Sequence, residues 1–259
     1  MGDNGQGTSN GSGGGTKRTP TAIANLSEMQ ALAAKSGAAA DRMLAGMLTD
    51  AVHPRFVKVD KNQQDTDTQR FVNATGIADK KPKIAKSEQE LEAMKARGET
   101  TGKYLYHTDT TTMFISDAKV FFEQYKKGRM YLSSGVFGDG TYYSTSSAGS
   151  WIYGYGRSGS YQFKGMMNSN ARVIDYSKLT KQITAFKKSH PKAAGVISRM
   201  STGYGGRDGQ KTVYALLFGY NVIRKNVSGA RKQDYMCVID RSAMTVAKKG
   251  IRPNETWEY

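Results

Sequence analysis

The sequence contains one cysteine, Cys237, and three histidines among its 259 residues. A single cysteine cannot form an intramolecular disulfide, and it excludes a four-cysteine zinc site. The histidines, at positions 53, 107 and 190, are too scattered to suggest a metal cluster. We therefore expect no disulfide framework and no bound metal, and we expect an intracellular (cytoplasmic) or virion-associated protein.

Long apolar segments are also missing from the sequence. No run reaches the roughly 18 apolar residues that a membrane-spanning helix needs. The first residues have no apolar stretch of the kind that secretory signals carry. The sequence thus predicts neither a membrane partner nor a secretion signal.

Charge is plentiful and unevenly distributed along the chain. Residues 101–259 hold 24 of the 38 Lys and Arg but 10 of the 22 Asp and Glu, so this part carries +14 of the net charge of +16. A basic surface attracts phosphates, as in nucleic acids and nucleotides, and also anionic proteins. Solubility alone explains the charge equally well, because no nucleic-acid-binding motif accompanies it.

Composition divides the chain into four parts. Residues 1–21 are rich in Gly, Ser and Asn and predict a flexible tail. Residues 22–57 are rich in Ala, Leu and Met and predict a helical segment, whereas the polar residues 58–69 predict a linker. The main domain is expected over residues 70–259.

Turn and capping signals refine this division. Ser27 with Gln30 reads as a capping box for the first helix, and Gly37 predicts a break between two helices. Ser87 with Glu90 predicts a second capped helix. Later helices are expected after Ser116, over residues 179–190 and over residues 192–200. Strands are expected over residues 104–107, 130–134, 140–145, 160–167, 213–219 and 235–240. Because strands outnumber helices and do not alternate strictly with them, an α+β fold is favoured over a doubly wound sheet.

Two glycine-rich stretches only imitate phosphate-binding loops. Gly154, Gly156 and Gly159 have the spacing of a dinucleotide-binding loop, but the flanking residues predict neither the preceding strand nor the following helix. The stretch 209–212 differs from the end of a phosphate-binding loop because Gln210 separates its glycine from its lysine. We interpret it as a turn before the strand expected at 213–219.

The stretch FGDGTYYSTSSAGSWIY, residues 137–153, is the most informative. Gly138 and Gly140 permit a tight turn and a close approach of the backbone to a ligand. The strand after the turn places Tyr142 and Tyr143 on opposite faces. Such a unit can stack an aromatic ring on a flat ligand, although glycine turns followed by tyrosines are usually structural.

This stretch resembles the donor-binding segment of the poly(ADP-ribose) polymerase-like, diphtheria-toxin-like ADP-ribosyltransferases, of bacterial or phage type. Tyr142 and Tyr153 match the register of that family's two tyrosines. Upstream, residues 104–107 (YLYH) resemble the strand that carries the family's histidine. Downstream, residues 232–239 (KQDYMCVI) resemble the strand that opens with its glutamate. The resemblance spans roughly residues 100–245, with the three motifs in the family's order.

The resemblance implies an ADP-ribosyltransferase fold in which two small antiparallel sheets form a cleft for NAD⁺, preceded here by a helical extension. It also implies mono-ADP-ribosyl transfer from NAD⁺ without a metal. The implied catalytic residues are His107, Tyr142 and Asp234. The implied donor-binding residues are His107, Thr108, Gly138, Gly140, Tyr142, Ser146 and Tyr153. In this scheme His107 binds the adenosine ribose, the two tyrosines sandwich the nicotinamide, and Asp234 stabilises the charge on the nicotinamide ribose.

Several departures from the family pattern leave alternatives open. Thr108 replaces the usual glycine, and Asp234 replaces the usual glutamate. In the family, aspartate at this position usually accompanies mono- rather than poly-ADP-ribosylation. A shift of one residue would put Gln233 at the acidic position. A second branch of the superfamily has Ser-Thr-Ser on its second strand, as at residues 144–146, but it has arginine where this chain has His107.

The sequence does not identify the acceptor, which can be a protein, a nucleic acid or a small molecule. The competing hypothesis is a non-enzymatic basic protein, nucleic-acid-binding or virion-associated, that retains a degenerate transferase fold. In that case His107, Tyr142, Tyr153 and Asp234 are structural residues only.

Overall fold

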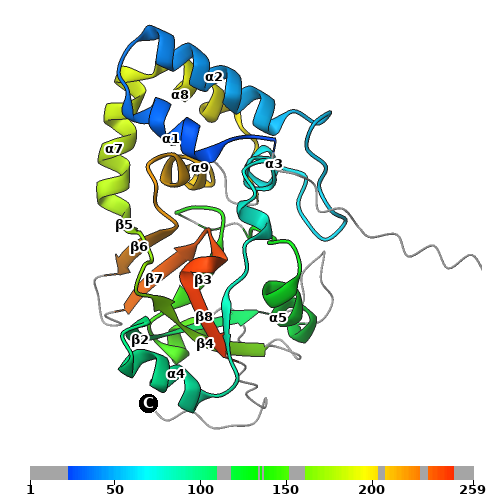
Figure 1. The fold of residues 1–259 in the computed structure, drawn as a ribbon, viewed down its shortest axis with the longest axis vertical. Helices are drawn as coiled ribbons and strands as arrows, with labels where there is room; N and C mark the ends of the chain where they lie inside the picture. The colour runs from blue at the N-terminus through cyan, green and yellow to red at the C-terminus, as the bar shows by residue number, and fades with distance from the viewer. Residues whose placement is uncertain are drawn as a thin grey trace, which may run out of the picture.

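The computed structural model describes residues 23–109, 118–133, 135, 137–151, 161–203, 208–227 and 233–247. The strands of the described residues form one mixed eight-stranded sheet in the order β1-β8-β4-β2-β3-β7-β6-β5 (Figure 1). They are β1 (Lys83–Ala85), β2 (Thr100–Asp109), β3 (Thr141–Ser144), β4 (Tyr161–Asn168), β5 (Val173–Asp175), β6 (Val222–Val227), β7 (Gln233–Val238) and β8 (Met244–Ala247). With the helices around this sheet, the expected α+β class is confirmed.

The sheet consists of two halves that meet at a narrow seam. One half is β1-β8-β4-β2 and the other is β3-β7-β6-β5, and each contains one parallel pair at its outer edge. β2 pairs with β4 from Thr100 to Asp109. By contrast, β2 and β3 share a single register pair, Tyr106 with Ser144. Where the resemblance implies two separate antiparallel sheets, the structure has one mixed sheet with this seam in its middle.

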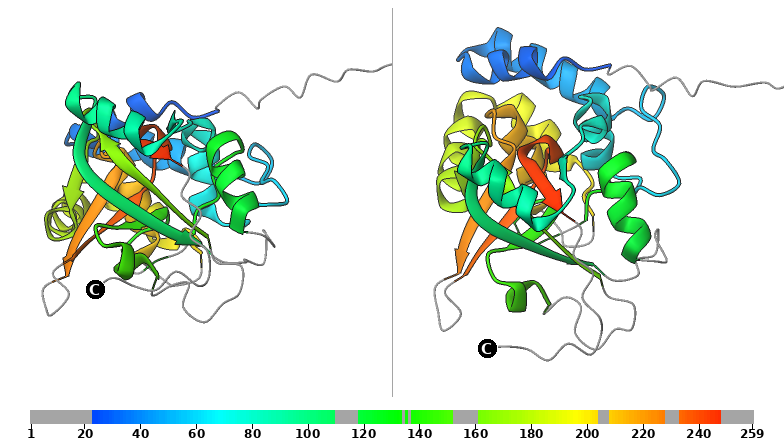
Figure 2. Two further views of the ribbon diagram at one scale, coloured as in Figure 1. Left: turned by 90° about the horizontal axis from the view of Figure 1, so that it is seen from below. Right: turned by 60° about the horizontal axis from the view of Figure 1, so that its bottom comes forward.

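Helices cover both faces of the sheet. They are α1 (Leu26–Ala34), α2 (Ala38–Val52), α3 (Asp67–Ala74), α4 (Glu88–Ala96), α5 (Ala118–Lys127), α6 (Ser147–Trp151), α7 (Tyr176–Ser189), α8 (Pro191–Arg199) and α9 (Gln210–Leu217), with the short 3₁₀ helices η1 (Ile77–Asp79) and η3 (Arg241–Ala243). Helices α7, α8 and α9 gather at one end of the molecule, and α1 and α2 lie beyond them (Figures 1 and 2). Helix α5 lies apart from this group and packs on β4. None of the described helices is long and apolar enough to cross a bilayer.

The N-terminal helices share one hydrophobic core with the C-terminal part of the chain. Met29, Leu44 and Leu48 are fully buried in the same cluster as Ile197 of α8 and Leu216 of α9. The break between α1 and α2 falls at Gly37, as expected, where the backbone has a φ of 120°. Residues 23–57 therefore form part of the same packed fold as the C-terminal helices.

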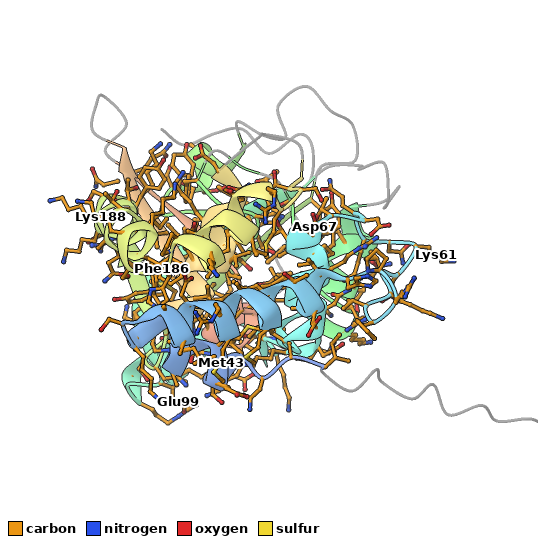
Figure 3. All side chains as sticks on the ribbon, turned by 90° about the horizontal axis from the view of Figure 1, so that it is seen from above. Met43, Lys61, Asp67, Glu99, Phe186 and Lys188 are labelled. Carbon is orange, nitrogen blue, oxygen red and sulfur yellow. The ribbon has the colours of Figure 1, made fainter. Side chains whose placement is uncertain are left out.

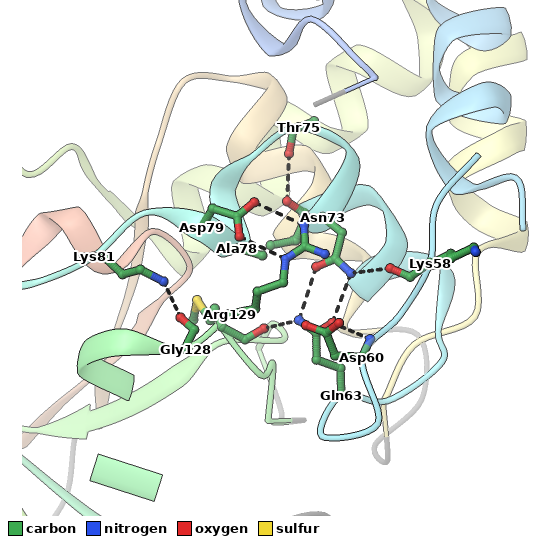
Figure 4. A network of polar contacts seen from close by, with 12 residues as sticks. Lys58, Asp60, Gln63, Asn73, Thr75, Ala78, Asp79, Lys81, Gly128 and Arg129 are labelled. Atoms are coloured by element: carbon green, nitrogen blue, oxygen red, sulfur yellow. Dashed lines mark hydrogen bonds and ion pairs between the residues drawn. The ribbon is translucent and has the colours of Figure 1, made fainter. Parts of the chain in front are cut away.

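The stretch 58–69, expected to be a linker, contributes buried side chains. Gln63 and Gln69 each donate a hydrogen bond to the carbonyl of Met130, at 2.7 and 3.1 Å. Gln63 also exchanges hydrogen bonds with Asn73 of α3, in the network that Figure 4 shows. Since α3 begins at Asp67, the boundary expected at Arg70 falls inside a helix.

Local structure differs from the sequence-based expectation at three places. Residues 213–217, expected in a strand, form most of α9 and are all buried. A continuous apolar run of this length does not distinguish a buried helix from a strand. Residues 130–133 contribute only an isolated bridge between Ser133 and Gly140. Asn25, rather than Ser27, caps α1 by accepting from the Glu28 amide, whereas Ser87 caps α4 as expected.

Candidate functional site

The three segments that carry the family resemblance lie on neighbouring strands. β2, β3 and β7 are adjacent in the sheet, although their residues are widely separated along the chain. His107 Nδ1 donates to the carbonyl oxygen of Tyr142 at 2.6 Å. The amide of Asp234 donates to Thr145 Oγ1 at 3.0 Å, and the Thr145 amide donates back to the Asp234 carbonyl at 3.1 Å. The fold thus assembles the histidine, tyrosine and acid segments at the seam.

The side chain of His107 lies on the face of the sheet that packs against α5. This aromatic face also carries Tyr143 and Phe163, and Phe121 of α5 packs against it. The His107 ring stacks on Phe121 with a centroid separation of 5.3 Å and lies 4.9 Å from the Phe163 ring. His107 is 7% exposed. Its position is therefore that of a histidine held inside an aromatic cluster.

Tyr142 points to the opposite face, because successive residues of a strand alternate. Its hydroxyl donates to the carbonyl of Gly138 at 2.5 Å and accepts from the amide of Phe137 at 3.3 Å. Burial is the main reason that the pKa of Tyr142 is raised. A Cβ on Gly135 would lie 1.9 Å from the Tyr142 ring, so that glycine makes room for it. The two hydrogen bonds of Tyr142 thus stabilise the glycine turn that precedes it.

The two other glycines of the turn have different roles. Gly138 has a φ of 151°, in the region that favours glycine. A Cβ on Gly140 would lie 2.6 Å from Cys237 Sγ and 2.7 Å from the carbonyl oxygen of Val238. Glycine at these two positions therefore allows the turn to pack closely against β7 and the residues around it.

A buried polar network occupies the face opposite His107. The hydroxyls of Thr108 and Ser150 lie 2.8 Å apart. Gln162 Nε2, from β4, donates to Ser150 Oγ at 2.6 Å and to Thr108 Oγ1 at 3.2 Å. Ser147 Oγ donates to Gln162 Oε1 at 3.0 Å. These contacts anchor α6 over β2 and β4, and we call this side of the seam the polar face.

Gln233, at the start of β7, extends the polar face. Its Nε2 donates to the Tyr235 hydroxyl at 2.5 Å, and its Oε1 lies 3.5 Å from Ser144 Oγ, which donates to it. A Cβ on Gly149 would lie 1.9 Å from Gln233 Oε1, so α6 approaches this side chain closely because residue 149 is glycine. Ser146 accepts from the Gly149 amide at 3.1 Å and caps α6. Among the expected donor-binding residues, Thr108 and Ser146 therefore belong to the polar face.

Asp234 points away from the polar face. Asn226 Nδ2 donates to Asp234 Oδ1 at 2.6 Å, and Lys103 Nζ lies 3.8 Å from Oδ2. Of the two alternatives for the acidic position, Gln233 thus shares a face with Thr108, and Asp234 does not. His107, Tyr142 and Asp234 do not converge on one point through their side chains. Tyr153 lies outside the described residues.

Two functional candidates were missed by reasoning from sequence. Gln162 places a buried amide in β4, and the alternation of polar and apolar residues in YQFK was its signal. Asp139, inside the glycine turn, is 2% exposed. Burial raises the pKa of its carboxyl group to about 6, although hydrogen bonds from the Gly203 amide and from Thr68 oppose the shift. A carboxyl group in this setting is costly to ionise.

Comparison of the chain with protein-family models, with curated proteins and with solved structures finds no match.

Proposed function

We propose that the chain is an NAD⁺-dependent mono-ADP-ribosyltransferase whose donor site is the polar face at the seam of β2, β3 and β7. The observation that supports this most is the adjacency of the three motif segments, because the resemblance requires those segments to meet. Because β2 and β3 share a single register pair, the two strands can separate at the seam to admit a ligand. The proposal goes beyond the α+β class to a particular chemistry.

The proposed reaction breaks the bond between the nicotinamide nitrogen and C1′ of its ribose. The bonding electron pair leaves with nicotinamide, and the ribose acquires oxocarbenium character in the transition state. A nucleophile of the acceptor, a protein side chain or a nucleic-acid group, then bonds to C1′ and loses a proton. Water in place of the acceptor gives free ADP-ribose. Groups that interact with the charge that develops at the ribose accelerate this reaction most.

From the side-chain geometry we propose roles that differ from the family pattern. Gln233 and Thr108 present an amide and a hydroxyl on one face, where they can hold the ribose hydroxyls. His107 and Tyr142 act as positioning residues, since one is packed among aromatic rings and the other closes the glycine turn. Gln233 offers a dipole but no charge, so we expect slow turnover in the native chain.

This assignment makes a gain of activity the sharpest test. Gln233→Glu is nearly isosteric and places a carboxylate where positive charge develops, so nicotinamide release should rise roughly tenfold. Gln233→Ala should lower release by a similar factor. Asp234→Asn, the control on the opposite face, should leave the rate unchanged. Initial rates of nicotinamide release from NAD⁺ measure all three effects.

Two results would contradict the proposal at different levels. Loss of activity in Asp234→Asn, with Gln233→Ala close to the native rate, would transfer the role from Gln233 to Asp234. Calorimetry that detects no binding at millimolar NAD⁺ would remove the transferase proposal altogether.

A further inference from the structure

Helices α7 and α8 carry positive charge without any acidic residue. Residues 176–199 include six Lys and Arg and no Asp or Glu. The six are exposed, and they are Lys178, Lys181, Lys187, Lys188, Lys192 and Arg199. Elsewhere in the described chain lysines and acids are often paired, as Lys126 and Glu123 are in α5. On this part of the surface the excess positive charge is thus most available to a binding partner.

Helical geometry gathers three of these lysines into a ridge. Leu179, Ile183 and Phe186 bury one side of α7. At 3.6 residues per turn, Lys181 and Lys188 lie about two turns apart on the opposite side, and Lys178 flanks them. We call Lys178, Lys181 and Lys188 the basic ridge. Figure 3 shows Lys188 at one edge of the molecule and Lys61 at the other.

The acids closest to the ridge are already engaged. Asp175, just before α7, pairs with Arg224 at 2.7 Å, and Asp208 pairs with Lys211. Asp41 of α2 accepts from the amides of Lys192 and Ala193, at 3.0 and 2.9 Å, and caps α8. Within the described residues, the ridge lysines form no ion pair. Lys178 contributes to the lowered pKa of Asp175 but forms no ion pair with it, so the charge of the ridge is available to an external anion.

A cavity opens beside the ridge, between α7, α8 and α9. Its volume is about 520 Å³, and its walls include Lys187, Thr184 and Ser198. Asp208 also lines it, and Lys211, on the same wall, pairs with this carboxylate. Tyr214 also lines it, and the buried Tyr214 hydroxyl has no hydrogen-bond partner within the described residues. An ammonium group and hydroxyls around a recess of this size suit a phosphate group.

We infer that the basic ridge and the neighbouring cavity bind the phosphate backbone of a nucleic acid. From Lys178 to Lys188 the helix rises about 15 Å, a length over which one strand of a duplex carries roughly four phosphates. A membrane surface fits less well, because α7 and α8 present no large exposed apolar side chain for insertion. The inference is independent of the transferase proposal, since neither helix carries a residue of the polar face.

Charge reversal on the ridge tests the inference. The variant Lys178→Glu/Lys181→Glu/Lys188→Glu is compared with Lys58→Glu/Lys61→Glu/Lys86→Glu, which changes the net charge equally through exposed lysines elsewhere. Fluorescence anisotropy follows binding of short mixed-sequence single-stranded RNA, single-stranded DNA and duplex DNA. The ridge variant should bind at least roughly tenfold more weakly, and the slope of log affinity against log salt should fall by roughly two. The control should bind within about twofold of the native chain.

Circular dichroism and thermal melting establish that both variants are folded. If the ridge variant does not fold, Lys178→Gln/Lys181→Gln/Lys188→Gln replaces it. A several-fold loss of affinity for nucleic acid in this variant supports the inference. Equal losses in the ridge and control variants would show unspecific attraction and overturn it. Native affinity in the ridge variant would overturn it too, as would binding of the native chain to phosphatidylserine vesicles but to none of the nucleic acids.

Discussion

Arg241→Ala is expected to lower the free energy of unfolding by about 4 kcal/mol, because Arg241 is a fully buried cation that joins three parts of the chain. Its Nη2 donates to the carbonyls of Ala78 and Gly128, at 2.7 and 2.8 Å. Its Nη1 donates to the carbonyl of Tyr125 and, at 3.3 Å, to that of Gln124. The alanine variant removes a donor from each of these carbonyls and leaves a cavity in a buried site. The carbonyl of Tyr125 loses its side-chain donor, whereas those of Ala78, Gly128 and Gln124 keep a second donor, from the Met130 amide, the Lys81 ammonium group and the Gly128 amide. A loss of this size is a large part of the stability of an ordinary domain.

Urea unfolding of matched variants isolates the effect. Arg241→Lys keeps a charge and an apolar stem but reaches fewer carbonyls, so we expect a loss of about 2 kcal/mol. Arg224→Ala, which removes a partly exposed arginine paired with Asp175, should cost less than about 1 kcal/mol. If Arg241→Ala and Arg224→Ala unfold at the same urea concentration, the carbonyls around Arg241 are satisfied in another way.

Strands with a strong local signal could be predicted, as could helices with clear caps. Alternation and β-branched or aromatic residues identified β2, β3, β4 and β7. The helix α4 was predicted from the spacing of Ser87 and Glu90, and in the structure Ser87 Oγ accepts from the Glu90 amide. The prediction of a strand at residues 213–217 was wrong because burial on all sides removes the periodicity by which a helix differs from a strand. Local sequence was sufficient only where the two faces of an element differ.

The composition of the candidate site could be predicted only in part, because strand register is a tertiary property. Alternation showed that Tyr142 and Tyr143 face opposite sides, but not which of them shares a face with His107. The single pair between Tyr106 and Ser144 decides this, and it places Tyr143 on the side of His107. A slip of one residue would exchange the two tyrosines. Likewise, the hydrogen bond between Gln162 and Thr108 joins positions too far apart for any local pattern to reveal.

The choice between Gln233 and Asp234 has the same origin. Both residues were compatible with the motif, and only the pairing of β7 with β3 assigns each to a face. Thr141 pairs with Val238, and the register continues to Ser144 with Tyr235. Gln233 therefore projects on the same side as Tyr235 and Ser144. Without that register, an acidic residue near the start of a strand was the natural candidate.

Asp139 is expected to make the protein less stable as pH rises from about 4 to about 6. The pKa of its carboxyl group has its ordinary value of about 3.8 in the unfolded chain and is raised to about 6 in the fold. Below the lower value both states are protonated, and burial carries no penalty for charge. Between the two values the unfolded chain releases a proton that the folded chain retains, so stability falls with rising pH. Above about 6 the full penalty, about 3 kcal/mol, remains.

Asp139→Asn should remove this pH dependence while preserving an oxygen that can accept from the Gly203 amide, which lies 3.2 Å from Asp139 Oδ2. We expect the variant to match the native chain in unfolding free energy at about pH 4 and to exceed it by about 2 kcal/mol at pH 7. Asp50→Asn, an exposed change of the same charge on α2, is the control and should shift stability little at either pH. A less stable Asp139→Asn at pH 7 would mean that the carboxylate has a favourable partner in the fold. The expected gain would instead show that the fold retains this carboxyl group in the glycine turn although its ionised form is destabilising.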